Sequence, residues 1–422
     1  MRTRALLVAL VLVSSGALAA DSALPPWTDH GDLPLPSWAR SVVPKGQEQP
    51  LVVAPRLDAD RRGVAFGATA LPLYGAARGT GCGGRYFQVG PSAWLCSDLA
   101  ELSASEYVPP SVDGAPLAAN DGLPYRYYFV GKEGANAYLD LARAGDGAPD
   151  EQLDPGFAVA VAEERSSNGE RWGRTHHGPW VALRDLFAAR PSGFHGEERA
   201  ELSFGWMLAD RTPVYGSIAR GKVLATRTRF EVVPVREERA TPGGAMLRIS
   251  DDGATETRWI ERRAVGRPTT AAPPAGVGPG ERWIDVELAS QTLVAYEGPT
   301  PVYATLVSTG KGAAGSDTAT HPGTYRIWVK LTTSTMDNLG ADDPELRYSM
   351  EDVPYVQFFD KGIALHAVFW HSDFGHVHSH GCVNLAPLDA RWLFRFTGPR
   401  LPAGWTAVLP ADADRGTVVR VR

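Results

Sequence analysis

The sequence predicts a mainly β protein in which several small β modules precede a separate C-terminal β domain with one short helix. Glycine and proline are abundant, at 45 and 33 residues, and tryptophan, tyrosine and valine recur in short runs between them. A chain of 422 residues is longer than a single hydrophobic core usually accommodates, so we expect roughly two to four domains. The net charge of -6, without a basic run, gives no sign of nucleic-acid binding.

The first 19 residues have the pattern of a secretory signal peptide. Two arginines precede an apolar run at residues 5–13, and Ala17-Leu18-Ala19 fits an A-x-A cleavage site. The apolar run falls short of the roughly 20 residues that a membrane-spanning helix needs, which disfavours a signal anchor. We therefore expect a mature protein without a transmembrane segment, in the periplasm or in the cell wall and extracellular space.

Residues 20–60 are rich in proline and polar residues and predict a tether. Self-similar segments follow, and three of them close with tryptophan-containing runs around Trp94, Trp180 and Trp259. This repetition predicts three β modules, which we place at residues 61–115, 120–195 and 200–266.

The modules share a pattern that resembles a bacterial SH3-like barrel. Each has a tyrosine-bearing start, a glycine-rich turn and a closing strand with a tryptophan. In exported wall enzymes such a module often binds peptidoglycan or packs on the catalytic domain. The three tryptophans are expected to fill the barrel cores without a ligand role, because an aromatic ring fills a small barrel efficiently. The pair His176-His177 is expected at the surface.

Residues 267–280, RPTTAAPPAGVGPG, are the clearest domain boundary. This linker is expected to hold the C-terminal domain, residues 281–422, away from the β modules. Within that domain, residues 284–296 alternate as a hairpin. The polar, turn-rich residues 331–351 predict a long loop or flap.

The three cysteines divide into a pair and a single thiol. Cys82 and Cys96 lie close together in a glycine-rich region and could close a disulfide loop in an oxidising compartment. Cys382 is then unpaired. It is either a buried free thiol or a nucleophile.

The surroundings of Cys382 favour the nucleophile. His366 ends an apolar strand, from which it can present an imidazole to a cleft, and Ser379-His380-Gly381 leads directly into the thiol. The small turn residue leaves room for backbone N–H groups to face an oxyanion. A helix is predicted at residues 385–396, whose N-terminus would favour a thiolate.

The segment GIALHAVFWHSDFGHVHSHGCVNLAPLDARW resembles the active-site signature of the L,D-transpeptidases (YkuD-like). The resemblance covers residues 281–422 and implies a β-sandwich or barrel-like catalytic domain with a short helix after the cysteine. It also implies a peptidoglycan cross-linking activity. Cys382 would attack the carbonyl before the D-alanine of a tetrapeptide stem, release D-alanine, and pass the acyl group to an amine of a second stem in a 3-3 cross-link.

The resemblance also implies roles for the neighbours of the thiol. His366 would act as base and then acid, held by a hydrogen bond to a carbonyl such as that of Ala367. His380 would tune the thiol, and the backbone N–H groups of Gly381 and Cys382 would form the oxyanion hole. The remaining substrate-side or structural positions are Ser379 and Asn384. Peptidoglycan stem peptides and carbapenem-type inhibitors are the expected ligands, with no cofactor and a monomeric protein.

Three alternative hypotheses remain. Water or a protein amine could replace the second stem as acceptor, which would give a carboxypeptidase, a hydrolase or an enzyme that attaches proteins to the wall. A zinc site could use the alternating His376, His378 and His380 with His371 and Cys382, although no helical H-x-x-x-H or C-x-x-C pair supports it. A catalytically dead wall-binding module is disfavoured because Cys382, His366 and His380 occur together.

Overall fold

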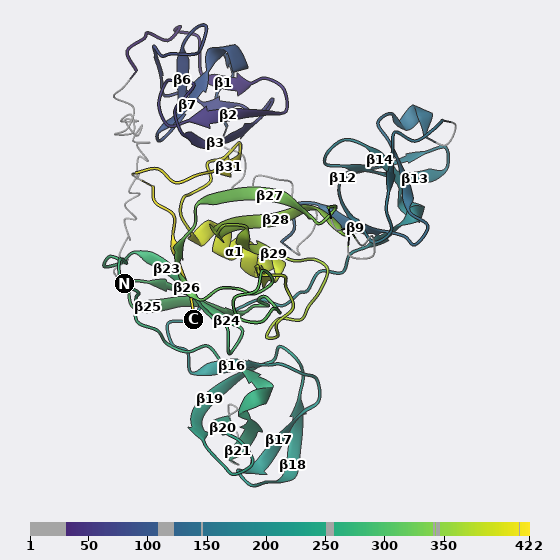
Figure 1. The fold of residues 1–422 in the computed structure, drawn as a ribbon, viewed down its shortest axis with the longest axis vertical. Coiled ribbons are helices and arrows are strands. Elements are labelled where there is room, and N and C mark those ends of the chain that lie inside the picture. The colour runs from purple at the N-terminus through teal and green to yellow at the C-terminus, as the bar shows by residue number, and fades with distance from the viewer. Residues whose placement is uncertain are drawn as a thin grey trace, which may run out of the picture.

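The computed structural model describes residues 31–108, 122–144, 147–249, 257–340, 342, 347–412 and 414–422. The expected signal peptide, residues 1–19, lies outside them. The protein is mainly β, as predicted, and α1 (Pro387–Phe396) is the one α-helix among the described residues. None of the helices in this part of the chain is both long and apolar enough to cross a membrane. Three small β units surround a central C-terminal domain (Figure 1).

The first unit spans residues 41–103 and begins inside the segment predicted as a tether. Its strands and 3₁₀ helix are β1 (Ser41–Pro44), β2 (Glu48–Val52), β3 (Arg61–Phe66), β4 (Leu71–Pro72), β5 (Gly75–Ala77), β6 (Tyr86–Gly90), β7 (Ala93–Cys96), η1 (Ser97–Leu99) and β8 (Ala100–Ser103). The tether prediction is wrong for β1 and β2, because Val42 and Leu51 are fully buried in the core of this unit. The apolar residues there stand in two short runs, Val42-Val43 and Leu51-Val52-Val53, separated by polar residues and proline, and they gave no periodic signal.

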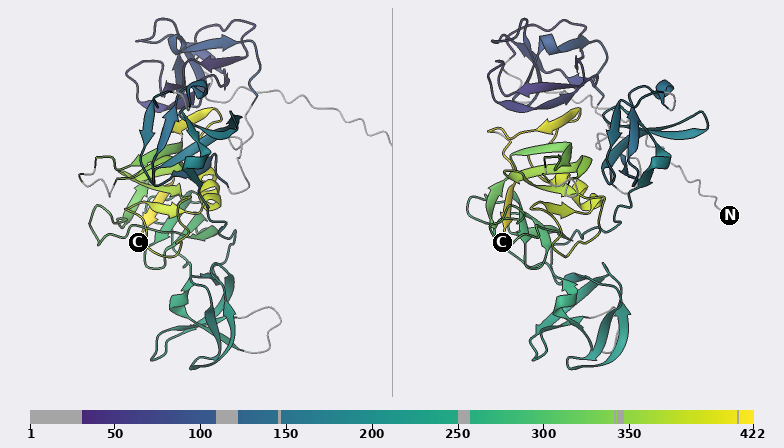
Figure 2. Two further views of the ribbon diagram at one scale, coloured as in Figure 1. Left: turned by 90° about the vertical axis from the view of Figure 1, so that its right-hand side faces the viewer. Right: turned by 45° about the vertical axis from the view of Figure 1, so that its right-hand side comes forward.

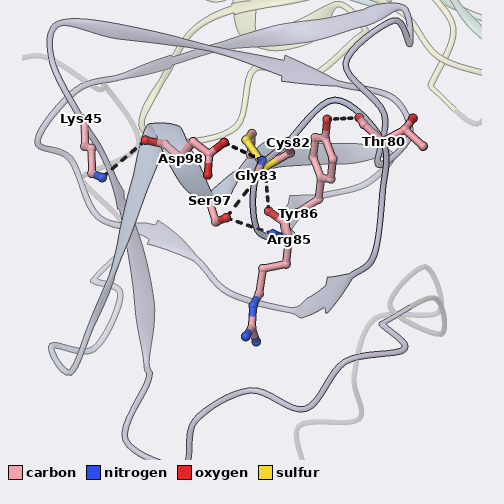
Figure 3. Close-up of a disulfide and its surroundings, with 9 residues drawn as sticks. Lys45, Thr80, Cys82, Gly83, Arg85, Tyr86, Ser97 and Asp98 are labelled. Atoms are coloured by element: carbon pink, nitrogen blue, oxygen red, sulfur yellow. Dashed lines mark hydrogen bonds between the residues drawn. A yellow bond between two sulfur atoms is a disulfide. The ribbon is translucent and has the colours of Figure 1, made fainter.

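A disulfide closes one loop of the first unit, as expected. Cys82 and Cys96 are bonded, with 5.8 Å between their Cα atoms. Beside the bridge, the Gly83 N–H donates to Asp98 Oδ2 (2.7 Å) and the Arg85 N–H to Ser97 Oγ (3.0 Å) (Figure 3). The η1 turn and the bridge therefore support the same glycine-rich loop.

The second unit spans residues 126–188. Its elements are β9 (Arg126–Val130), β10 (Ala135–Tyr138), η2 (Leu141–Arg143), β11 (Glu151–Leu153), β12 (Ala158–Ser167), β13 (Glu170–Thr175), β14 (Trp180–Ala182), η3 (Leu183–Asp185) and β15 (Leu186–Ala188). The third unit spans residues 204–266. Its elements are β16 (Phe204–Met207), β17 (Thr212–Ser217), β18 (Arg220–Arg227), β19 (Val232–Arg239), β20 (Met246–Ile249), β21 (Arg258–Glu261), η4 (Arg262–Ala264) and β22 (Val265–Gly266).

The sequence repeat corresponds to a shared structural ending. In each unit a strand carries the repeated tryptophan, one 3₁₀ turn follows, and a short last strand closes the unit. Trp94, Trp180 and Trp259 are all buried, which agrees with their expected place in the cores. The SH3-like identity of the units stays a prediction.

The C-terminal domain is a β-sandwich with a helix in its core, as predicted. One sheet has the order β25-β24-β23-β32-β26, formed by β25 (Thr300–Leu306), β24 (Thr292–Glu297), β23 (Arg282–Glu287), β32 (Val418–Val421) and β26 (Gly323–Arg326). The other pairs β31 with β27, β27 with β28, β28 with β29 and β29 with β30, formed by β31 (Trp405–Val408), β27 (Val329–Asp337), β28 (Ser349–Asp360), β29 (Ile363–Ala367) and β30 (Val383–Leu385).

The predicted hairpin at residues 284–296 is confirmed, since β23 and β24 pair with Ile284 opposite Ala295. Ile284 joins Leu365 of β29 and Leu393 of α1 in the core between the sheets. Buried Lys330 donates from Nζ to the Phe394 and Thr397 carbonyls at the C-terminal end of α1 (2.6 and 2.8 Å), where a cation offsets the helix dipole. The helix is thereby fixed to the second sheet.

The first unit joins the C-terminal domain by strand pairing. β3 lies antiparallel to β31, with Gly63 opposite Val408. A Cβ atom at position 63 would lie 2.4 Å from the Ala407 carbonyl oxygen, so the close approach of the two strands requires glycine. Arg62 is buried at this junction and pairs with Asp414 (Nη2–Oδ2 2.7 Å).

The third unit lies at the end of the domain opposite the first unit (Figure 2), and aromatic side chains make the contact. Trp206 of β16 shares a core with Trp283 and Tyr296 of the first sheet. The linker also packs there: the Ala271 N–H donates to Tyr296 Oη (3.0 Å), and Val277 lies against the same core. The expectation that residues 267–280 hold the domains apart is therefore wrong, because small apolar residues of the linker are themselves in contact with the domain.

Candidate active site

Two paired strands place the candidate residues on one face. β29 and β30 run parallel, with Leu365 opposite Val383 and His366 opposite Asn384. Side chains alternate along a strand, and Leu365 and Val383 point into the domain core. Cys382, next to the start of β30, is therefore on the opposite face, together with His366 and Asn384.

His366 is buried, and its tautomer follows from one contact. Its Nδ1 lies 2.9 Å from the carbonyl oxygen of Ala367, the contact expected from the sequence. A carbonyl can only accept a hydrogen bond, so Nδ1 carries the proton and Nε2 keeps its lone pair. Burial lowers the pKa of His366 to about 4, against a smaller opposing effect of the Ala367 hydrogen bond. The ring is neutral at pH 7 and can accept a proton at Nε2.

Cys382 is half-buried, and it is the one free cysteine. It packs beside Val353, Val356 and Ala364. Burial raises the pKa of the thiol above its ordinary value, although a hydrogen bond with the Ala364 backbone acts in the other direction. The resting state is therefore a neutral thiol beside a neutral imidazole.

The expected help from the helix dipole is not present. α1 begins at Pro387, after the whole of β30, and extended chain covers roughly 3.3 Å per residue. The helix dipole acts mainly within the first turn. The prediction that the helix N-terminus favours a thiolate is wrong because a strand, not the helix, directly follows the cysteine.

The turn before Cys382 is held by its own serine. The Gly381 N–H donates to Ser379 Oγ (3.1 Å), and Ser379 Oγ in turn donates to the Cys382 carbonyl. Gly381 has a φ of +124°, a conformation that favours glycine. Since the Gly381 N–H already has an acceptor, its expected oxyanion role requires that this bond open, whereas the role of the Cys382 N–H stays a prediction.

Thr309 and Thr320, which were not predicted as site residues, hold this turn in place. Thr320 Oγ1 donates to the Gly381 carbonyl (2.7 Å). The Thr309 carbonyl accepts from the His378 and Ser379 N–H groups (3.0 and 3.1 Å). Thr309 follows β25 and Thr320 precedes β26, and nothing in their spacing indicates contact with the cysteine turn.

Asn384 is hydrogen-bonded to His371, which the sequence analysis considered only as a possible zinc ligand. Its side-chain amide lies 3.0 Å from His371 Nε2, and His371 Nδ1 accepts from the Asp373 N–H (3.1 Å). The neutral His371 ring therefore carries its proton on Nε2, which needs an acceptor. Asn384 Nδ2 stands at that position and Asn384 Oδ1 is buried without a partner, so we infer that the amide is turned over, with its oxygen facing His371. Burial lowers the pKa of His371 to about 4, which keeps this arrangement uncharged.

His380 is exposed and lies beside a hairpin. Its ring stacks with Tyr348 at 6.3 Å between centroids. Tyr348 directly precedes β28, and β27 and β28 pair from Val329–Phe358 to Asp337–Ser349. Residues 331–337 and 349–351 of the predicted loop are therefore strand, and they form the half-buried end of a two-stranded hairpin.

The alternating histidines do not form the metal cluster that was considered. Within the described ranges, the ligand atoms that come within 4.8 Å of one another in this loop belong to His371, Asp373 and His378. His376, His380 and Cys382 are outside this group. Both nitrogens of His371 already have partners, so the group offers a metal one ligand fewer than the count suggests.

The comparisons agree with the geometry for the C-terminal domain. Residues 281–421 match the family model of the L,D-transpeptidase catalytic domain (YkuD). No curated protein matches the chain. The match leaves the three β units outside the family model.

Three solved structures are among those similar to this chain. An L,D-transpeptidase (Yku) from Stackebrandtia nassauensis is 28% identical over 35% of this chain and 57% of its own, with a TM-score of 0.23. The catalytic domain of the E. faecium L,D-transpeptidase is 22% identical over 34% of this chain and 98% of its own (TM-score 0.26). An L,D-transpeptidase from Mycobacterium smegmatis is 18% identical over 45% of this chain and 99% of its own (TM-score 0.27). The chain thus spans little more than half the length of the Stackebrandtia structure.

Proposed function

We propose that this protein is a peptidoglycan L,D-transpeptidase with Cys382 as its nucleophile, because residues 281–421 match the family model of the L,D-transpeptidase catalytic domain (YkuD). The observation that carries the proposal is the His366 tautomer, fixed by the Ala367 carbonyl on the strand face that Cys382 shares. A thiol and a proton-accepting imidazole nitrogen are the two groups that acyl transfer by cysteine requires.

The proposed first half-reaction begins from uncharged groups. The Cys382 sulfur attacks the peptide carbonyl that precedes the D-alanine of a tetrapeptide stem while its proton passes to His366 Nε2. The tetrahedral intermediate collapses, the C–N bond breaks, and His366 returns the proton to the departing amine. D-Alanine leaves and a thioester remains on Cys382.

The second half-reaction reverses these steps with a new amine. An amine of a second stem attacks the thioester carbonyl and gives a proton to His366, which returns it to the sulfur as the thioester bond breaks. The product is a 3-3 cross-link, and the enzyme is again a neutral pair. Exposed His380 stacks on half-buried Tyr348, which interacts with Cys382, and we propose that these two rings contact the stem.

Two measurements test the proposal. We expect a carbapenem to add its mass once to the wild-type protein and not to Cys382→Ala. We also expect purified protein and tetrapeptide muropeptides to yield 3-3 dimers with release of D-alanine. Tripeptides alone would indicate water as the acceptor, and absence of any adduct on the wild type would reject the acyl-enzyme.

A further inference from the structure

Outside the active site, the ligand atoms of His176, His177 and Asp352 come together where the second unit contacts the C-terminal domain, with Glu351 next to His177. His176 and His177 follow β13, and Glu351 and Asp352 are on β28. Asp352 Oδ2 lies 2.9 Å from His176 Nδ1 and 3.3 Å from His177 Nε2, which is also 3.7 Å from Glu351 Oε1. The histidines had been expected at the surface; His177 is exposed there, whereas His176 is partly covered.

The spacing of these atoms fits a tetrahedral ion. Zinc binds histidine nitrogen and carboxylate oxygen at about 2.0–2.2 Å, and a tetrahedron of that size has edges of about 3.3 Å. The three separations of 2.9, 3.3 and 3.7 Å lie around that value. Little movement is therefore needed to place an ion among His176, His177 and Asp352, whereas Glu351 Oε1 must turn toward this group to become the fourth ligand.

The other side of each ligand is already held by the protein. Asp352 Oδ1 accepts from Thr333 Oγ1 (2.9 Å), and Glu351 Oε2 accepts from the Ala160 N–H (2.7 Å). The His176 ring stacks on Tyr125, at 4.6 Å between centroids. Such outer contacts orient ligands in metal sites, and here they leave Asp352 Oδ2 and Glu351 Oε1 directed at the histidines.

Charge balance favours a cation at the same place. The Asp352 and Glu351 side chains are only 5% and 14% exposed, and both carboxylates in their ionised form would carry two negative charges. Burying uncompensated charge is costly, and burial raises the pKa of Glu351 to about 7. One divalent ion would neutralise both carboxylates, whereas without the ion protons on the histidines or on Glu351 must do so.

We propose that His176, His177, Glu351 and Asp352 form a structural site for a divalent ion of the zinc class. Binding requires His176 Nδ1 to present its lone pair, so its proton moves to Nε2 or to solvent. The ion would join the second unit to the β27–β28 hairpin, whose strand β28 begins one residue after Tyr348. The site needs no part of the acyl-transfer chemistry, and it departs from the expectation of a metal-free protein.

Calorimetric titration of chelator-treated protein with ZnCl₂ tests the site. We expect one zinc per molecule and an affinity at least about 10-fold lower for His177→Ala, since loss of a single ligand removes one of four bonds. The His177 side chain is 58% exposed, so this variant should fold, which circular dichroism checks. His378→Ala, which alters the other histidine cluster, should bind as the wild type does.

The proposal has clear contrary outcomes. No stoichiometric binding by folded wild-type protein would overturn it, and so would binding lost in His378→Ala but kept in His177→Ala. A second measurement is the melting temperature: zinc should raise it for the wild type and for His378→Ala but not for Asp352→Asn. Equal shifts in all three proteins would place the ion elsewhere.

Discussion

The two histidine sites of this protein differ in what lies beside the ring. At the active site, His366 contacts a backbone carbonyl and is surrounded by apolar groups, so burial lowers its pKa to about 4. At the interface of the second unit, His177 lies beside Asp352, whose hydrogen bond raises the pKa of the ring. Burial alone would raise the pKa of Asp352, but its hydrogen bonds with His176 and His177 outweigh burial and lower it.

This difference teaches that the partner of the ring, more than its burial, decides its use. A neutral carbonyl fixes the tautomer without adding charge, so His366 can take a proton and give it back. Carboxylates instead hold positive charge at the interface, either as protons on the rings or as a metal ion. The same residue type is thus suited to proton transfer in one place and to joining two units in the other.

The largest expected effect is at the thiol. Cys382→Ala should abolish carbapenem acylation, because the variant has no atom with which to form the thioester. Intact-protein mass spectrometry measures the adduct. His177→Ala is the matched control and should be acylated at the wild-type rate. An adduct on Cys382→Ala would show that Cys382 is not the acylated residue.

The next effect is at the base. His366→Gln should slow acylation by about 10²–10⁴-fold, the usual contribution of general acid–base catalysis. Stopped-flow loss of carbapenem absorbance gives the rate. If His380→Gln slowed acylation as much as His366→Gln does, His366 would not be the only residue that transfers the proton.

The pH dependence of stability should also separate the sites. The folded-state pKa of His366 is about 4, below the ordinary 6.5, so the unfolded chain takes up a proton first as the pH falls. The free energy of unfolding should therefore decrease by about 3 kcal/mol between pH 6.5 and pH 4 on account of this ring. Urea unfolding at several pH values measures this decrease. In His366→Gln the free energy of unfolding should decrease by about 3 kcal/mol less over the same pH range, because the titrating ring is absent.

The smallest effect concerns the turn before the thiol. Ser379→Ala removes the hydroxyl that accepts from the Gly381 N–H and donates to the Cys382 carbonyl. We expect about 1 kcal/mol of lost stability and acylation slowed by about 10-fold or less. Ser379→Thr keeps the hydroxyl and should restore most of both, whereas unchanged stability and acylation in Ser379→Ala would show that the contacts with Thr309 and Thr320 hold the turn without the hydroxyl.

The sequence predicts local features of the site well. Cys82 and Cys96 are close in the chain and are bonded, and the expected contact between His366 and Ala367 involves adjacent residues. The strand before His366 and the helix after Cys382 also follow from short apolar patterns. Such features depend on neighbouring residues, which a single sequence displays directly.

Contacts between distant segments could not be predicted in the same way. Thr320 meets Gly381 across 61 positions, and His176 meets Asp352 across 176 positions. Each is an ordinary polar residue in its own segment, and only the pairing of β12 with β28 and the packing of the domain core bring the partners together. For the same reason, the flap prediction missed a hairpin whose strands are polar on their exposed side.

The short disulfide loop has a consequence for oxidative folding. Cys82 and Cys96 are 14 positions apart, whereas a bridge from Cys96 to Cys382 would close a loop about 20 times longer. Each doubling of loop length costs about 0.6 kcal/mol, so the local pair is favoured by roughly 80-fold before any tertiary structure forms. Early capture of both cysteines in the first unit would spare the nucleophile from mispairing while the remaining three quarters of the chain folds.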